Sequence, residues 1–290
     1  MSLPGRCIAI QDKAVVLMYY GFPDRREEMH DYLKDILHGK DPPEGLIREN
    51  LQKLDIVGGS TPSTKIVKSI KEKVSKRLED EGYSVYLLSK HYTPSLNDAA
   101  KIVQGDEVYE VPLFPVYSKF IFDGYFGPLE EQLKGKKLIR VSDIGFNRGM
   151  IDFYKGKIKS DRNSLLTFSA HSIPLVGPDS YSESVLRLSR EIADTRQFIN
   201  IYHSQGPFRP KWLTPYPEYS VSFAKENGFK RIQIVPIGFI YEHLEVLYDL
   251  DYRLKNEAAK EGIGFDRVPL PNDGNVVIDA IVDSIYRSKS

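Results

Sequence analysis

Apolar and amphipathic segments alternate along the whole chain, and this alternation predicts its secondary structure. Eight short runs of mainly aliphatic and aromatic residues have the length of buried strands, and they cover residues 14–20, 84–89, 108–113, 137–141, 164–169, 198–202, 232–237 and 265–269. The spacing of apolar residues predicts helices over residues 25–37, 46–54, 63–81, 96–103, 181–194, 218–227, 242–261 and 276–288. Strands that are apolar throughout and alternate with helices indicate an α/β fold, in which helices cover both faces of parallel sheets.

The predicted strands fall into two groups of four, which the segment SDIGFNRGM at residues 142–150 separates. We therefore predict two domains of similar construction, residues 1–145 and residues 146–290. A weak internal repeat supports this division, because KHYTP at 90–94 and YHSQGP at 202–207 each combine His and Pro after a strand. The last predicted helix could pack back on either half, the first domain included.

Composition and charge exclude several classes of protein. The 290 residues are 41% hydrophobic and 28% charged, which excludes a disordered chain. Forty Lys and Arg balance forty Asp and Glu without a basic run, so we expect no nucleic-acid partner. The single cysteine, Cys7, excludes an internal disulfide and a Cys-ligated cluster and indicates a cytoplasmic protein. No window approaches about 18 consecutive apolar residues, so we expect no integral membrane segment.

Candidate chemistry follows the predicted strands, because open parallel sheets bind ligands at the carboxyl ends of their strands. The turn GGSTP at residues 58–62 lacks the Lys-Ser/Thr of a phosphate loop, and no GxGxxG follows the first strand. Capping of the next helix explains this turn better than nucleotide binding does. The other strand-end segments that we single out are YYGFP (19–23), PVYSK (115–119), FSAHSIP (168–174) and GFIYEHLE (238–245).

One histidine and a row of carboxylates are the main candidates for a site. His171 ends a buried strand, where a lone histidine is more often a hydrogen-bonded structural residue than a ligand. A rotation of about 100° per residue predicts that Glu242, Glu245 and Asp249 share one stripe of a helix. A solvated acidic face is the alternative, but apolar neighbours favour the border of a cleft. An imidazole that faces a carboxylate suits metal binding or general-base catalysis.

Two well-known hydrolytic patterns are absent from the sequence. No G-x-S-x-G elbow precedes a helix, and HLEVL at residues 243–247 has one histidine where a zinc-binding HExxH has two. A serine hydrolase and a two-histidine zinc enzyme are therefore poorly supported.

The motifs together resemble those of a known family. FSAHSIP (168–174) with GFIYEHLEVLYDLD (238–251) is similar to the two signature segments of ferrochelatases, which insert ferrous iron into porphyrins. The resemblance continues in order over nearly all of the chain, in the segments YGFP (20–23), IVGGSTP (56–62), PVYSKFIFDGY (115–125) and YHSQGPFRPKWLTP (202–215).

The resemblance implies a fold, a reaction and a set of site residues. It implies two similar Rossmann-like domains, each a parallel sheet flanked by helices, with a porphyrin cleft between them. It implies a lyase of heme biosynthesis that inserts Fe²⁺ into protoporphyrin IX or coproporphyrin III and releases two protons. His171 and Glu245 would be the catalytic and metal-binding pair, with Asp249 relaying protons or metal. The expected substrate-binding residues are Tyr20, Phe22, Ile36, Ser118, Phe120, Phe122 and Tyr125.

The chain departs from the family pattern in places that bear on substrate binding. Bacterial relatives have an arginine before a glycine where this chain has Leu37-His38-Gly39, so His38 and Lys40 are the candidates for the porphyrin propionates. Arg253 stands where the acidic row continues in some relatives. No C-terminal cysteine cluster exists, so we expect neither an iron–sulfur cluster nor another tightly bound cofactor, and we expect a monomer. Ligands of this kind also suit Zn²⁺ and Co²⁺.

The sequence leaves two rival functions and one division of labour open. A cobalt chelatase for a sirohydrochlorin-type ring would share the architecture but usually carries a second histidine in place of Glu245. A tetrapyrrole carrier would keep the aromatic walls and would not need the pair His171 and Glu245. Which member of this pair acts as base and which as metal ligand is also open.

Overall fold

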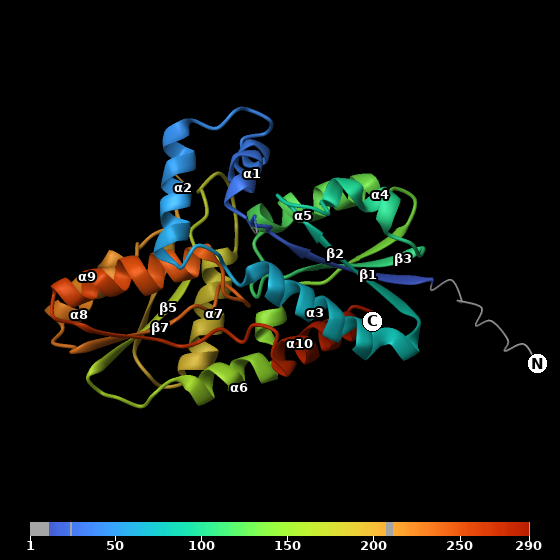
Figure 1. Ribbon diagram of the computed structural model, residues 1–290. Helices are drawn as coiled ribbons and strands as arrows, with labels where there is room; N and C mark the ends of the chain where they lie inside the picture. Colours follow the sequence, from blue (N-terminus) through green and yellow to red (C-terminus); the bar gives the residue numbers. More distant parts are fainter. Residues whose placement is uncertain (1–11, 24, 207–210, 290) are drawn as a thin grey trace, which may run out of the picture.

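Two parallel sheets form the framework of the protein (Figure 1). The computed structural model describes residues 12–23, 25–206 and 211–289, so Cys7 lies outside the described residues. The first sheet has the order β2-β1-β3-β4 and consists of β1 (Lys13–Tyr19), β2 (Tyr83–Ser89), β3 (Glu107–Pro112) and β4 (Lys137–Arg140). The second sheet has the equivalent order β6-β5-β7-β8 and consists of β5 (Ser164–His171), β6 (Phe198–His203), β7 (Arg231–Val235) and β8 (Gly264–Arg267). The predicted α/β class and all eight predicted strands are confirmed.

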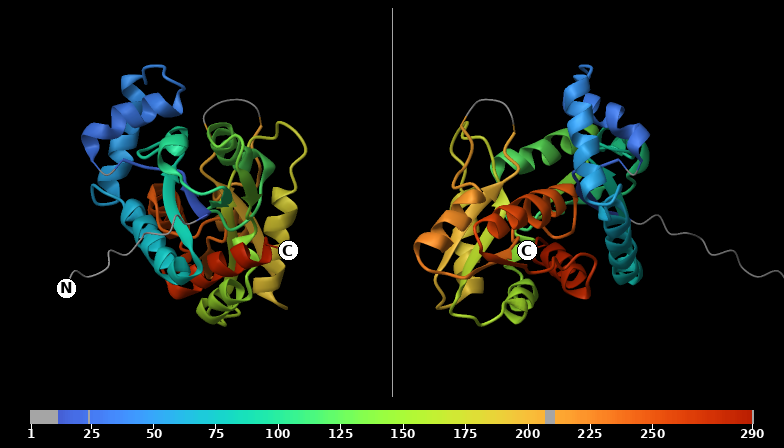
Figure 2. Two further views of the ribbon diagram at one scale, coloured as in Figure 1. Left: turned by 90° about the vertical axis from the view of Figure 1, so that its right-hand side faces the viewer. Right: turned by 60° about the vertical axis from the view of Figure 1, so that its left-hand side comes forward.

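Helices cover the sheets and extend beyond them (Figures 1 and 2). The α-helices of the described residues are α1 (Met29–Ile36), α2 (Glu44–Ile56), α3 (Ser63–Leu78), α4 (Ala99–Ile102), α5 (Lys119–Gln132), α6 (Arg148–Lys157), α7 (Tyr181–Ala193), α8 (Glu218–Glu226), α9 (Lys255–Lys260) and α10 (Asn275–Arg287). Short 3₁₀ turns are η1 (Arg26–Glu28), η2 (Glu79–Glu81), η3 (Leu96–Asp98) and η4 (Ile144–Phe146), and η5 (Val246–Leu254) is a π-helix. None of the helices in the described ranges combines the length and the apolar character needed to cross a membrane.

The sequence pattern missed two helices, α5 and α6. Helix α5 contains aromatic residues, two glycines and Pro128, all of which weaken an intrinsic helix signal. It nevertheless begins at a capped end, because the hydroxyl of Ser118 accepts a hydrogen bond from the N–H of Ile121. In α6 the side-chain oxygen of Asn147 accepts from the N–H of Gly149 at 2.9 Å. Local capping and tertiary packing therefore override weak propensity at both places.

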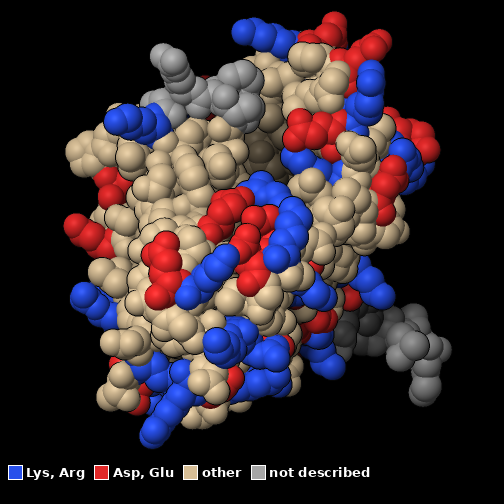
Figure 3. Space-filling view, turned by 90° about the vertical axis from the view of Figure 1, so that its left-hand side faces the viewer, with Lys and Arg blue, Asp and Glu red and all other residues tan. Residues whose placement is uncertain are grey.

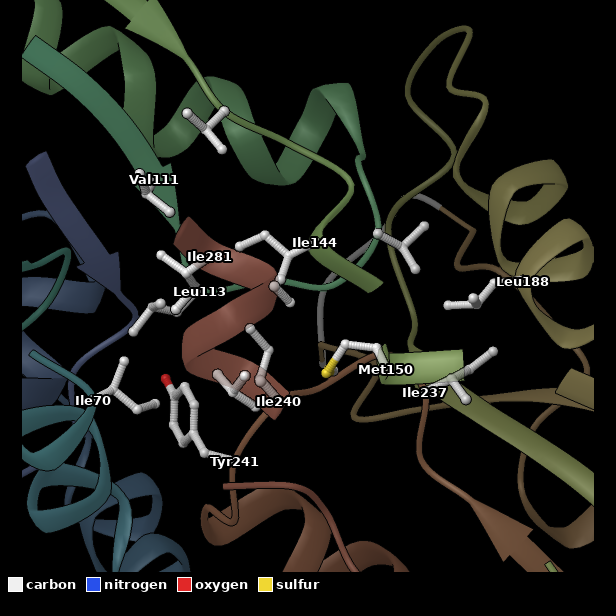
Figure 4. Close-up of a cluster of buried hydrophobic side chains, with 14 of the residues drawn as sticks. Ile70, Val111, Leu113, Ile144, Met150, Leu188, Ile237, Ile240, Tyr241 and Ile281 are labelled. Carbon is white, nitrogen blue, oxygen red and sulfur yellow. The ribbon is translucent and has the colours of Figure 1, made fainter. Parts of the chain in front are cut away.

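One apolar cluster connects the two halves of the chain (Figure 4). It contains buried residues of the first sheet and of the second, and Ile281 of α10 lies among them. Helix α10 packs against α3 of the first half and against α6. The boundary at residues 145 and 146 stays a prediction, because this continuous core does not separate the halves.

Helices α1 and α2 have a small core of their own. Met29, Tyr32 and Leu33 of α1 pack with Leu54 of α2 in a cluster separate from the sheet cores. The two helices stand above the sheets in Figure 1, and α2 reaches the π-helix η5 of the second half. This small unit therefore covers one side of the space between the halves.

A glycine after β7 lets this segment approach β5 closely. The N–H of Gly238 donates to the carbonyl of Ser169 at 3.1 Å, and a β-carbon at residue 238 would lie 2.6 Å from the Cα of Ala170. This separation is too short for carbon atoms, and the neighbour is backbone, so one of the two segments would have to shift. His171 follows Ala170 on β5, so a shift of this strand would also move His171.

We predict that Gly238→Ala lowers the free energy of unfolding by about 1–3 kcal/mol, the usual cost of overpacking a core. Gly156→Ala is the matched control, because Gly156 lies in α6 with no atom near the β-carbon position and is not followed by proline. The control should be neutral or gain about 0.5–1 kcal/mol, since alanine favours a helix interior over glycine. Chemical denaturation measures both values, and equal stability of the two variants would contradict the close approach.

Candidate active site

A cavity of about 1030 Å³ lies between the two halves of the chain. Its walls come from strand ends, from α2 and α5 of the first half, and from η5 of the second half. Large, mainly apolar pockets at the carboxyl ends of parallel strands are the usual ligand sites of α/β proteins. On the face shown in Figure 3, acidic and basic side chains are interspersed around a hollow between two lobes.

His171 lies at the end of β5 in the cavity wall. Its Nδ1 is hydrogen-bonded to the carbonyl of Ser172, and because a carbonyl only accepts, Nδ1 carries the proton. In the neutral ring, Nε2 therefore has a free lone pair, and it lies 3.4 Å from Oε1 of Glu245. The structure thus brings together the histidine and the carboxylate that the sequence singled out.

Burial and mutual attraction act against each other in this pair. Burial by itself lowers the pKa of His171, but the carboxylate of Glu245 and the hydrogen bonds outweigh it, so this pKa is raised above its usual value. Burial raises the pKa of Glu245, but the neighbouring imidazole of His171 outweighs it, so this pKa is lowered. Each group therefore stabilises the charged form of the other.

The helix that carries the acidic row begins at Leu244, two residues later than predicted, and it continues from Val246 as a π-helix. In η5 the backbone hydrogen bonds reach five residues back, as in the bond from Lys255 N–H to the Leu250 carbonyl. Such π-helical segments are rare and often occur at functional sites. Glu245, Asp249 and Arg253, four residues apart, all line the cavity.

The prediction that Glu242 shares this stripe is wrong. Its carboxylate accepts from Arg267 Nη1 at 2.9 Å and lies near the N–H of Leu270, away from the cavity lining. Arg267, at the end of β8, also donates to both oxygens of Asp251 at 2.6 and 2.8 Å. These bonds tie both the chain before the π-helical segment, at Glu242, and the segment itself, at Asp251, to the edge strand of the second sheet.

Asp249 is a buried carboxylate with contacts on both oxygens. Oδ2 accepts from the hydroxyl of Ser204 and lies 3.7 Å from Nδ1 of His203, whereas Oδ1 lies 3.8 Å from Arg253. Burial opposes its charge, but His203, Ser204 and Arg253 outweigh burial and lower the pKa of Asp249 to about 2. This carboxylate is therefore ionised at neutral pH.

Four predicted aromatic residues of the first half line the cavity, namely Tyr20, Phe22, Phe120 and Tyr125. Burial is the main cause that raises the pKa of Tyr20, and the negative charge of Glu245 is the second. The hydroxyl of Tyr20 therefore interacts electrostatically with a carboxylate of the second half. The aromatic residues and the pair of His171 and Glu245 therefore border the same space.

Five predicted substrate-binding residues are not among the cavity-lining residues. Ile36 packs against the core of α1 and α2, and Ser118 caps α5 and donates to Asp179 at 2.9 Å. Phe122 is fully buried in the core on the other side of α5. His38 and Lys40 are exposed in the turn after α1. Residues 120 and 122 point in different directions on the helix α5, so Phe120 lines the cavity and Phe122 does not.

Several lining residues were not predicted from the sequence. Lys90 follows β2, forms no ion pair with a carboxylate of the described residues, and lies 5.5 Å above the ring of Tyr125. Burial lowers the pKa of this ammonium group. Reading the end of β2 by the strand-end rule would have found it. Burial also lowers the pKa of His243 to about 4, so this cavity histidine is neutral.

The described residues hold no ready-made metal cage. Within residues 12–23, 25–206 and 211–289, no group of three or more His, Cys, Asp or Glu side chains is placed to hold a metal ion. The pair of His171 and Glu245 can supply two ligands, which suits transient contact with a metal rather than permanent retention.

Comparison with known proteins gives a consistent family and fold. The family model described as Ferrochelatase matches residues 12–289. The ferrochelatase of Thermoplasma acidophilum is 32% identical over 278 residues, which cover 92% of this chain and 88% of that protein. The coproporphyrin III ferrochelatase of Anoxybacillus flavithermus is 29% identical over 293 residues, which cover 92% of this chain and 93% of that protein.

Solved structures share the architecture at low sequence identity. CbiX, the terminal enzyme of siroheme biosynthesis in denitrifying bacteria, has a TM-score of 0.57 and 14% identity, with 96% of this chain and all of that chain covered. The cobalt complex of the sirohydrochlorin chelatase SirB from Bacillus subtilis subspecies spizizenii has a TM-score of 0.53 and 9% identity, with 96% and 95% covered. The chain has the fold of these chelatases, and by sequence it belongs to the ferrochelatase family.

Proposed function

We propose that the cavity between the halves binds the porphyrin and that His171 and Glu245 carry out the insertion of ferrous iron. The observation that carries this proposal is the contact of 3.4 Å between Nε2 of His171 and Oε1 of Glu245 in the cavity wall. The family assigns metal insertion to the chain, and this pair supplies the chemistry that the reaction needs.

The reaction exchanges two protons for one divalent cation. Two pyrrole N–H bonds break, two protons leave, and Fe²⁺ binds the four ring nitrogens, so the total charge is conserved. Nε2 of neutral His171 and the carboxylate of Glu245 are both hydrogen-bond acceptors. Because they face each other, a proton or a cation between them relieves their repulsion. The pair is therefore suited to take up a pyrrole proton or to contact the incoming metal.

The first half contributes the surface that holds the ring. Flat aromatic side chains give a large apolar contact area, and Phe22 and Phe120 offer such area in one cavity, with the buried Tyr125 behind it. A ring held on these residues would present its nitrogens to His171 and Glu245, which is catalysis by orientation. One chain supplies both walls, which supports the predicted monomer. The cytoplasmic location stays a prediction.

Two rival functions share parts of this description. The fold of sirohydrochlorin chelatases is the same, so the fold does not distinguish them, but the family match and the carboxylate of Glu245 favour iron and porphyrin. A carrier without catalysis would not need the buried pair. Anaerobic incubation with Fe²⁺ and protoporphyrin IX, coproporphyrin III or sirohydrochlorin, followed by absorbance, separates these functions and identifies the tetrapyrrole.

We predict that His171→Ala lowers the rate of metal insertion by ~10²- to 10⁴-fold, the range that a positioned proton acceptor contributes. Porphyrin titration should still show binding, because the aromatic wall is intact. His30→Ala, at an exposed histidine of α1, is the control and should keep the wild-type rate. A His171→Ala variant with near wild-type turnover would contradict the proposed role.

A second prediction concerns pH. His171 accepts a proton or contacts metal only as the neutral ring, so the rate should fall as pH drops through its pKa. Because the pKa of His171 is raised, the midpoint of this fall should lie above about 6.5, the value of an unperturbed histidine. In Glu245→Gln the negative charge is gone and burial remains, so the midpoint should move to lower pH. The midpoint is measured from insertion rates at saturating metal and porphyrin over a range of pH. If the Glu245→Gln variant is active and its midpoint does not move, the charge of Glu245 does not act on His171.

The third prediction compares two lysines as contacts for porphyrin carboxylates. We expect Lys90→Met to raise KM for the porphyrin with little change in kcat, because Lys90 lines the cavity and its cation is unpaired among the described carboxylates. Lys40→Met should leave both constants unchanged, because Lys40 is exposed outside the cavity. If KM for the porphyrin rises in Lys40→Met and not in Lys90→Met, then Lys40 and not Lys90 contacts the porphyrin carboxylates.

A further inference from the structure

A second histidine–carboxylate pair lies beside the first, and we infer that its histidine, His203, is a positioning residue of the active site. Together with Ser204 it holds the carboxylate of Asp249 in the cavity wall, four residues along η5 from Glu245. The inference rests on the proposed function and adds a residue that the mechanism above does not use.

His203 occupies the position next to His171 in the neighbouring strand. It ends β6, and the strand register pairs it directly with His171. Its side chain is fully buried. The ring of Phe239 lies beside both histidines, with its centroid 5.3 Å from that of His203 and 6.3 Å from that of His171. The two strand ends thus bring two histidines side by side, one in the cavity wall and one buried, each facing a carboxylate of the same helix.

The hydrogen bonds around Asp249 have only one consistent direction. A carboxylate accepts and does not donate, so the hydroxyl of Ser204 donates its proton to Oδ2 of Asp249. The oxygen of Ser204 is then an acceptor for Nδ1 of His203, which lies 2.9 Å away. His203 therefore fixes the rotation of the Ser204 hydroxyl, and this hydroxyl in turn fixes Asp249.

The backbone of Ser204 supports a specific role for this connection. Ser204 has a φ of 60°, in the left-handed region that serine rarely adopts. Residues held in such conformations persist when their surroundings determine them, and they cluster at functional sites. The conformation of Ser204 places its hydroxyl between His203 and Asp249, at the cavity wall.

A competing contact shows why Asp249 needs to be held. Its other oxygen lies 3.8 Å from Arg253, whose guanidinium also binds Glu218 at 2.8 Å on the outer side. Without the bond from Ser204, the carboxylate would be free to rotate toward Arg253 and away from the side of Glu245. His203 and Ser204 thus keep a charged oxygen of Asp249 in the wall that meets the substrate.

The test measures iron insertion by four variants of the full-length protein, with Fe²⁺ and the porphyrin that the wild type accepts. We expect His203→Leu to lower kcat by ~10- to 100-fold, as the loss of an orienting partner typically does, with KM for the porphyrin unchanged. His203→Asn should restore most of the rate, because its amide nitrogen is bonded to Cγ as Nδ1 is and can donate to Ser204. Combining His203→Leu with Asp249→Asn should be no slower than Asp249→Asn alone, since both act through one carboxylate.

Controls separate positioning from a loss of structure. Ile201→Val removes one buried methylene group from the same strand, and it should lower stability slightly and keep the rate. If His203→Leu does not fold, Ser204→Ala replaces it, because it breaks the same connection with the removal of one oxygen atom. Loss of rate in Ile201→Val equal to that in His203→Leu would overturn the inference.

The remaining outcomes also decide between the hypotheses. Multiplied losses in the double variant would show that His203 acts independently of Asp249. A His203→Asn variant as slow as His203→Leu would show that the hydrogen bond to Ser204 is irrelevant. Either result overturns the inference while the proposed function stands. A wild-type protein that inserts no metal into any porphyrin would instead overturn the proposed function itself.

Discussion

The arrangement of the candidate active site depends on one half-buried contact between two groups that both accept hydrogen bonds. Nε2 of His171 and Oε1 of Glu245 lie 3.4 Å apart, and the Nδ1 proton of His171 is already committed to the Ser172 carbonyl. A buried carboxylate is costly unless a counter-charge accompanies it. The pair is therefore most stable when a cation or a proton lies between its members, which is the event that metal insertion requires.

The matching order of the two sheets explains how one cavity receives residues from both halves. β1 corresponds to β5 and β2 to β6, because each pair takes the same place in its sheet. In the first pair of equivalent strands, Tyr20 follows β1 and His171 ends β5. In the second pair, Lys90 follows β2 and His203 ends β6. Equivalent positions thus carry two cavity-lining residues, Tyr20 and Lys90, in the first half, and the proposed proton acceptor His171 and its neighbour His203 in the second.

The sequence was sufficient for the sheets and for the centre of the site, and insufficient for its periphery. His171 and Glu245 could be predicted because they follow buried strands or begin a helix, where the parallel architecture itself determines location. Phe122 and Ser118 could not be placed, because the helical conformation of α5 depends on capping and packing that local propensity does not show. The π-helical stretch is likewise invisible to a pattern with a period of 3.6 residues. Glu242 was misplaced for a different reason, because the helix begins only at Leu244 and the carboxylate of Glu242 binds Arg267.

The bonds of Arg267 have a consequence for how the acidic wall keeps its register. A π-helical segment holds one residue more than an α-helix of similar span, so reversion to α-helical bonding would turn Asp249 relative to Glu245. Arg267 donates hydrogen bonds to Asp251 inside the segment and to Glu242 before it. The chain is therefore bound to one guanidinium both before and after Glu245 and Asp249. The geometry of the two carboxylates in the cavity wall is thus set by the edge strand of a sheet, at a residue that does not line the cavity.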